Sequence, residues 1–171
     1  AAELLINSYC VTYDSDVIIT RCTNNFGPRQ FAEKLIPKTI ILAHRDQKIP
    51  IYGKGRNIRD WIHVDDHCNG ILSLLLDGKA GQSYNISGNN ELDNTTIVKR
   101  ILGVMGKSED LIEYVEDRPG HDFRYSMSSN KISKEYDWKP KISFGEGIEM
   151  TVEWYLNHEE TWKDLSPKIL D

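Results

Sequence analysis

Apolar residues in this chain change between two spacings along its length. Short β-branched runs predict buried strands, whereas apolar residues that recur every three or four positions predict helices. Strands are expected at Val17–Arg21, Ile49–Tyr52, Asn57–Val64, Gln82–Ser87 and Leu111–Glu116. Helices are expected at Ala1–Tyr13, Lys34–His44, Asp65 to Leu76, Asn94 or Thr95 to Met105, Ser129–Tyr136 and Phe144–Asn157. Strands that alternate with helices favour the α/β class with a largely parallel sheet, and here they are too few for a complete doubly wound domain.

Small polar residues and glycines predict where several elements end. The helix N-caps are expected at Asp65, at Asn94 or Thr95, and at Ser143. Gly78 and Gly81 are expected to end the helix from Asp65, and Gly106 the helix to Met105. Asn24–Pro28 is expected to be a loop, and Thr161–Asp171 an irregular tail.

Composition narrows the class of protein. The 171 residues carry a net charge of −5, so general nucleic-acid binding is not expected, and an anionic ligand needs a local basic pocket. No apolar run approaches the ~18 residues of a membrane span, and the start has no signal-peptide pattern. The three cysteines form no metal-type pair, which predicts buried free thiols in a reducing, cytoplasmic compartment.

Arginine and amide side chains stand beside predicted strand ends and turns. Asn24 and Asn25 follow a strand, where ligands often bind in α/β sheets, although asparagine also suits a turn. Arg59 in a strand and Arg118 in a Pro-Gly loop offer the planar donors that bind phosphate. The alternative for Arg59 is a structural ion pair with Asp60 or Asp65.

Other polar positions also have structural interpretations. The segment Lys34–Pro37 begins a helix and can hold an anion, or Lys34 is simply exposed. From the residues themselves, Tyr52 in Pro50–Tyr52 is expected in the core, Asn94 at a helix N-cap, and His121 in its loop, ordered through Asp122. A ligand role for these three positions is implied only by the resemblance described below.

One cluster suggests a metal site, which we do not predict. His63, Asp65, Asp66 and His67 are close in sequence, but the change from strand to helix at Asp65 separates their side chains.

Four motifs together closely resemble the dTDP-glucose 4,6-dehydratases, a family of extended short-chain dehydrogenase/reductases. The motifs are RCTNNFGPRQFAEKLIPK from Arg21, IPIYGKGRNIRDWIHVDDH from Ile49, YNISGNNE from Tyr84 and DRPGHDFRY from Asp117. The likeness runs from Ala1 to about Tyr155. It implies the C-terminal part of an NAD-binding Rossmann-like fold with a small α/β substrate-binding domain.

The resemblance also implies roles for individual residues. It assigns Asn25 to the cofactor NAD. It assigns to dTDP-glucose the residues Asn24, Lys34, Leu35, Ile36, Pro37, Pro50, Ile51, Tyr52, Arg59, Asn94, Arg118 and His121. The family's catalytic residues and its Gly-rich loop are expected upstream of Ala1, so we expect this chain to be the C-terminal half of a longer enzyme and inactive alone.

The resemblance further implies an organisation and a partner. Residues 1–30 and about 57–88 are expected in the Rossmann-like domain, about 31–56 and 89–160 in the sugar-nucleotide domain, and 161–171 in a tail. The first helix is expected in a homodimer interface. Two other functions stay open: another NAD-dependent sugar-nucleotide epimerase or decarboxylase, and a nucleotide-sugar-binding module without chemistry.

Overall fold

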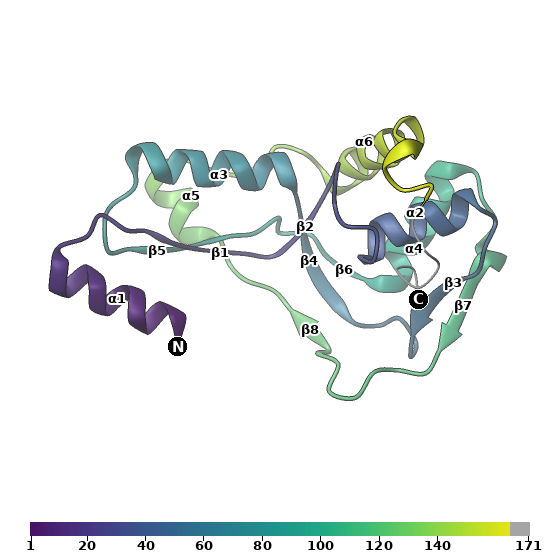
Figure 1. The fold of residues 1–171 in the computed structure, drawn as a ribbon, viewed down its shortest axis with the longest axis horizontal. Coiled ribbons are helices and arrows are strands. Elements are labelled where there is room, and N and C mark those ends of the chain that lie inside the picture. The colour runs from purple at the N-terminus through teal and green to yellow at the C-terminus, as the bar shows by residue number, and fades with distance from the viewer. Residues whose placement is uncertain (165–171) are drawn as a thin grey trace.

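The computed structural model describes residues 1–164 as helices and strands that alternate along the chain (Figure 1). The helices are α1 Ala2–Tyr13, α2 Leu35–His44, α3 Val64–Asp77, α4 Asn94–Met105, α5 Asn130–Tyr136 and α6 Phe144–Asn157, with single 3-10 turns at Glu109–Leu111 and Glu159–Thr161. The strands are β1 Ile19–Cys22, β2 Asn24–Phe26, β3 Ile49–Tyr52, β4 Ile58–His63, β5 Ser83–Ile86, β6 Glu91–Asp93, β7 Ile112–Val115 and β8 Arg124–Tyr125. The α/β class is therefore confirmed. The predicted tail lies outside the described residues from 165 onward.

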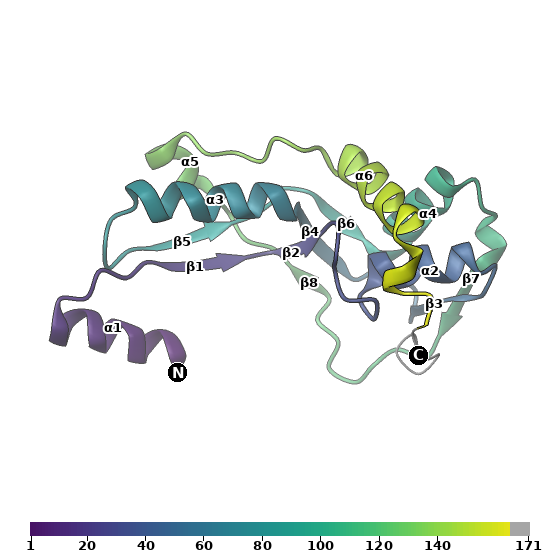
Figure 2. The ribbon, with the colours of Figure 1, turned by 45° about the horizontal axis from the view of Figure 1, so that its top comes forward.

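Most strand pairs run parallel, as the alternation of elements predicts. β1 pairs with β5, β2 with β4, β3 with β7, and β4 with β8, all in parallel, whereas β4 and β6 are antiparallel. β4 is thus the strand with the most partners in the described part of the chain. In Figure 2, α3 and α1 lie on opposite sides of β1 and β5, and the remaining long helices gather beyond β4.

Asn24–Phe26 is a strand, so the predicted loop at this position is wrong. Asn24 pairs with Trp61 and Phe26 with His63, so the chain enters the sheet of β4 directly after β1, which itself pairs with β5. The strand has only three residues and is defined by its partner β4, so its own sequence gives little periodic signal. The short strands β6 and β8 were not predicted from the sequence for the same reason.

Two predicted helix caps are also one residue or more too late. α3 begins at Val64 with His63 as its N-cap, because the His63 imidazole Nδ1 accepts a hydrogen bond from the Asp65 amide at 3.3 Å. α4 has Asp93 as its cap, whose carboxylate accepts from the Thr96 amide at 2.9 Å. Ser143 caps α6 as predicted, accepting from the Glu146 amide.

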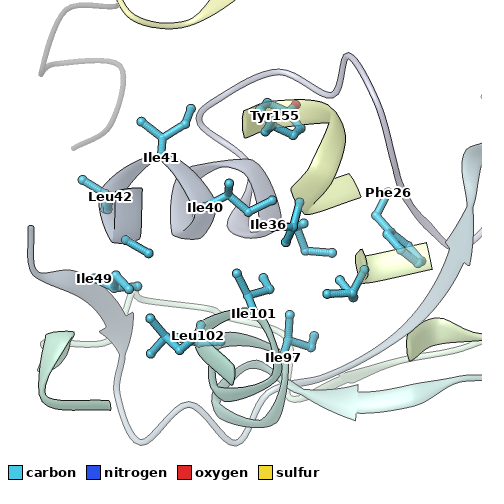
Figure 3. Close-up of a cluster of buried hydrophobic side chains, with 14 of the residues drawn as sticks. Phe26, Ile36, Ile40, Ile41, Leu42, Ile49, Ile97, Ile101, Leu102 and Tyr155 are labelled. Carbon is cyan, nitrogen blue, oxygen red and sulfur yellow. The ribbon is translucent and has the colours of Figure 1, made fainter. Parts of the chain in front are cut away.

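A large apolar core lies between α2, α4 and α6 (Figure 3). Ile36 and Ile40 on α2 face Ile97 and Ile101 on α4, and all four are fully buried. Tyr155 on α6 closes the same cluster, and the predicted core face of α6 is confirmed by the burial of Ile148, Val152 and Tyr155. Each such aliphatic side chain contributes about 1.5–3 kcal/mol through its removal from water.

A smaller apolar cluster fixes α3 and α5 to the other end of the sheet. It combines Ile62 of β4, Leu74 of α3, Ile86 of β5 and Ile132 of α5. Asp66 on α3 links this cluster to the segment that precedes α6. Its buried carboxylate accepts hydrogen bonds from the backbone amides of Lys141 and Ile142.

The N-terminal elements are less buried than the sequence suggests. α1 has no buried residue and β1 has none that is fully buried. The cysteines are free but not buried: Cys10 on α1 and Cys22 on β1 are partly exposed and Cys68 on α3 is exposed. The prediction of buried thiols is wrong because these faces are not covered by other parts of residues 1–164. Among those residues, no helix has the length and apolarity to cross a membrane.

His63 makes folding stability depend on pH. Burial lowers the pKa of its imidazole, while the unfolded chain has the ordinary value of about 6.5. The unfolded state then binds more protons, so the free energy of unfolding should fall as the pH is lowered through about 6.5 and below. Urea unfolding from pH 8 to pH 5 measures this loss. His63→Asn keeps a capping side chain without a titrating group and should show a smaller loss; an unchanged pH profile would contradict the assignment. His67, whose pKa burial also lowers, is left intact in both proteins.

Gly88 permits a close approach between β5 and β4. A Cβ atom at this position would lie 1.8 Å from the Trp61 carbonyl oxygen, which is backbone and cannot rotate away. Gly88→Ala should therefore destabilise the fold by about 1–3 kcal/mol or more. Gly103→Ala is the control, since an added Cβ there meets nothing within 4 Å and should stabilise α4 by roughly 0.5–1 kcal/mol. Similar urea midpoints for the two variants would refute the argument.

Candidate functional site

A cavity of about 720 Å³ opens beside β2, β3 and β4 and the start of α2. Its walls combine charged, amide and aromatic side chains from segments far apart in the sequence. The lining residues are Asn24, Gln30, Phe31, Glu33, Lys34, Leu35, Lys38, Pro50, Ile51, Tyr52, Arg59, Trp61, Asn94, Arg118 and His121. The volume lies in the range of small-molecule sites, about 300–1,000 Å³.

The sheet places three of these side chains on one face. Arg59 and Trp61 are two positions apart on β4, so both point to the same side of the strand. Asn24 pairs directly with Trp61 on the neighbouring strand β2. An arginine, an indole and an amide therefore lie together because of strand geometry alone.

The start of α2 forms a second wall. Lys34 is the N-cap of the helix in an extended conformation, and its side chain makes no capping hydrogen bond. The amides of a first helical turn favour an anion. Pro37 falls in that turn, where its missing N–H is tolerated, so it neither breaks nor interrupts α2. The Lys34 ammonium contacts the Glu33 carboxylate at 2.6 Å, and both side chains are exposed.

A loop at residues 117–122 covers a third side. The Asp117 carboxylate accepts a hydrogen bond from the Arg118 amide and contacts the His121 Nδ1 atom, each at 2.8 Å. The hydrogen bond with His121 lowers the pKa of Asp117, followed by smaller effects of the Arg118 amide and charge. The Arg118 guanidinium carbon stands 4.5 Å from the centre of the Tyr52 ring. The loop is thus folded around Asp117, and Arg118 extends from it over Tyr52.

Arg59 and Arg118 keep their positive charge available. Arg59 donates to the carbonyl oxygens of Ile58 and Asp122 at 2.8 and 2.9 Å. Within residues 1–164 neither arginine has a carboxylate within ion-pair distance. The alternative of an ion pair between Arg59 and Asp60 is not realised, because the Asp60 carboxylate accepts from the Asn90 amide at 2.6 Å.

Three residues assigned by the resemblance do not line the cavity. The side chain of Ile36 is fully buried in the apolar core and that of Pro37 is buried beside it. Asn25 points elsewhere, since successive strand residues face opposite sides. Its amide nitrogen donates to the Thr23 carbonyl oxygen at 3.2 Å, while its amide oxygen is buried without a hydrogen-bond partner in the described chain.

Several lining residues were not predicted from the sequence. They are Gln30, Phe31, Glu33, Lys38 and Trp61. Trp61 had a usable signal, because a residue two positions from Arg59 on a strand shares its face. Gln30 and Phe31 lie in an irregular segment before α2, whose course the local sequence does not define.

The polar cluster near the start of α3 is part of the fold. His63 caps α3, its Nδ1 atom lies 3.7 Å from the Asp65 carboxylate, and Asp66 binds backbone amides. In the part of the chain that the structure describes, no group of three histidine, cysteine or acidic side chains is arranged to hold a metal ion.

Mostly parallel strands with covering helices, and a cavity beside β2, β3 and β4, place the chain in the α/β class. Solved structures of the Rossmann type superpose on the chain. A dTDP-glucose 4,6-dehydratase from Bacillus anthracis in complex with NAD has 47% sequence identity and a TM-score of 0.92, over 96% of this chain and 52% of that one. A dTDP-glucose 4,6-dehydratase from Streptomyces venezuelae, also with NAD bound, has 41% identity and a TM-score of 0.93, over 96% of this chain and 51% of that one.

The chain belongs to the GDP-mannose 4,6 dehydratase family, whose model matches residues 1–151. Among curated relatives, the dTDP-glucose 4,6-dehydratase of Streptomyces niveus is 44% identical over 165 residues, covering 96% of this chain and 49% of the relative. The chain spans about half the length of the curated relatives it matches. The expected family resemblance and fold are thereby confirmed.

Proposed function

We propose that this chain is the sugar-nucleotide-binding half of an NAD-dependent dTDP-glucose 4,6-dehydratase. The complete enzyme would convert dTDP-glucose to dTDP-4-keto-6-deoxyglucose, a lyase reaction that supplies deoxysugars such as rhamnose. The names of relatives at 41–47% identity support this substrate and reaction. The catalytic residues are not assigned to this chain.

The observation that carries the proposal is a pair of arginines for which residues 1–164 supply no carboxylate partner. A diphosphate supplies the anionic oxygens that two guanidinium groups can bind through paired hydrogen bonds. Arg59 and Arg118 come from β4 and from the 117–122 loop, and both line the cavity. A chain with a net charge of −5 thus presents a cationic surface where a nucleotide diphosphate would fit.

The remaining lining residues suit the rest of a sugar nucleotide. We assign Asn24 and Asn94 to polar groups of the sugar and diphosphate, and His121 to the same ligand. Pro50, Ile51 and Tyr52 on β3 frame the thymine with backbone groups and one ring. Lys34 and Leu35 bind through the start of α2, whereas Ile36 and Pro37 serve through backbone geometry because their side chains are buried.

NAD is the proposed cofactor, and Asn25 is the residue proposed to contact it. The buried amide oxygen of Asn25, which has no hydrogen-bond partner within residues 1–164, is an acceptor that suits a carboxamide N–H donor. When bound, NAD accepts and returns a hydride. Asn25 would orient it from the strand next to the substrate cavity.

The two apolar clusters support a division into two units. We propose residues 1–30 and about 57–88 for the Rossmann-like unit, and about 31–56 and 89–160 for the sugar-nucleotide unit, with one change. The helix α5 packs on β5 and shares its cluster, so it joins the first unit.

Exposed apolar residues on α1, among them Leu4, Leu5 and Val11, support a homodimer interface. The free cysteines are consistent with a cytoplasmic location.

A titration of the chain with dTDP, UDP and NAD tests this function. We expect saturable dTDP binding that weakens as salt is raised, because charge attraction contributes to it. Calorimetry at two salt concentrations gives the comparison. A folded chain that binds UDP more tightly than dTDP would favour an epimerase, and one that binds neither would refute the proposal.

Arg118→Gln removes the positive charge that lies over the Tyr52 ring and tests its contribution to ligand binding. Losing a hydrogen bond to a charged group costs about 1.5–3 kcal/mol, so dTDP affinity should fall about 10- to 150-fold. Arg124→Gln is the matched control on the same connection, because Arg124 pairs with Glu91 at 2.7 Å and does not line the cavity. Equal affinities for the two variants would exclude Arg118 from the site.

A further inference from the structure

The segment between β2 and α2 separates two cavities. Gln30 and Phe31 line the large cavity described above, and they also line a smaller one of about 290 Å³ on the other side. The smaller cavity is bounded by Trp154, Tyr155 and Trp162 from the C-terminal part of the described chain. Residues 30 and 31 therefore form a wall between the two cavities. The position of this wall depends on the contacts that it makes on the side of the smaller cavity.

Tyr155 holds this wall through a single hydrogen bond. Its hydroxyl donates to the Gln30 carbonyl oxygen, 125 residues away in sequence. The Tyr155 side chain is 2% exposed, and Figure 3 shows it on α6 beside the segment that follows Phe26. Burial raises the pKa of Tyr155 to about 12, so the hydroxyl remains a donor at any pH used for binding.

The anchor is itself fixed by the turn after α6. The Trp162 indole Nε1 donates to the Tyr155 carbonyl oxygen at 2.8 Å, and Trp162 is also 2% exposed. The Arg29 guanidinium carbon stands 5.8 Å from the centre of the Trp154 ring, which adds a second contact between the segment and α6. Burial and the hydrogen bond from Trp162 thus hold Tyr155 in place, so it can restrain the segment between β2 and α2.

The segment with Gln30 and Phe31 is also bonded to β2, the strand that places Asn24 in the cavity. The Gln30 side-chain amide donates to the Asn25 carbonyl oxygen at 2.8 Å, which ties the segment back to β2. Lys34 lies at the other end of the same segment, at the start of α2. Arg29 has a φ of 64°, an αL conformation that costs a non-glycine residue energy and needs support from its surroundings.

We propose that Tyr155 is a positioning residue that holds segment 27–34 as the preformed wall of the sugar-nucleotide cavity. The inference rests on the proposed function for the identity of the ligand. Without the hydroxyl, the segment samples other conformations, and only the fraction in the binding conformation accepts the ligand. Tyr155 does not line the ligand cavity and acts through the Gln30 backbone.

The test compares Tyr155→Phe with Tyr84→Phe in the full chain. Both variants keep a buried ring and lose a hydroxyl, but Tyr84 lies in the smaller apolar cluster, where its hydroxyl contacts Glu135 and Tyr136. We expect Tyr155→Phe to weaken dTDP binding about 3- to 10-fold, the net value of one hydrogen bond, and to speed amide hydrogen exchange in residues 27–34. Tyr84→Phe should change neither. Exchange in α4 serves as an internal reference in both variants.

Each result decides a separate question. Wild-type affinity in Tyr155→Phe, or equal losses in both variants, overturns the positioning role. If the wild-type chain does not bind dTDP, the proposed function fails, and hydrogen exchange alone decides the anchor: unchanged exchange in residues 27–34 overturns it. Faster exchange confined to that segment, together with weaker dTDP binding, supports it.

Discussion

The structure depends on the pairing of β4 with its neighbours. This strand contacts β2 and β8 in parallel and β6 in antiparallel fashion, so it fixes three segments that are distant in sequence. Its buried Asp60 adds a further constraint by accepting a hydrogen bond from the Asn90 amide, which holds the turn after β5. Because strand residues alternate between faces, the same strand buries Ile62 on one side and presents Arg59 and Trp61 to the cavity on the other.

The apolar core and the cavity share their supporting elements. α2 buries Ile36 and Ile40 against α4, and its first turn faces the cavity. β3 buries Ile49 while Tyr52 lines the site. A rigid core behind a polar wall keeps donors in place before a ligand arrives, which lowers the entropy that binding must overcome. The position of the cavity is therefore a consequence of how the core packs.

Much of this arrangement was predictable from local sequence, and the remainder depends on long-range contacts. The helices α2, α3, α4 and α6 were predicted because each has an apolar face that repeats at helical spacing. The strands β2, β6 and β8 have two or three residues and exist through pairing with β4, so no window of sequence contains their signal. Most site residues were named through the resemblance, whereas Gln30 and Phe31 reach the cavity through a segment whose course is fixed by Tyr155, 125 residues later.

The charge of the cavity lining depends on where the nearby carboxylates bind. Glu33 lines the cavity and pairs there with Lys34, whereas three aspartates near the two arginines are engaged in other contacts. Asp117 is adjacent to Arg118, but its carboxylate is occupied by His121 and by a backbone amide. The backbone carbonyl oxygen of Asp122 accepts a hydrogen bond from the Arg59 guanidinium, and no carboxylate within residues 1–164 pairs with that guanidinium. Asp60 is turned into the fold. The Arg118 guanidinium lies over the face of the Tyr52 ring. Such a cation–π contact contributes about 0.5–1 kcal/mol at an exposed site, and it orients the cation without neutralising its charge. The two arginines at the cavity thus lack carboxylate partners within residues 1–164 because the nearby aspartates bind other groups.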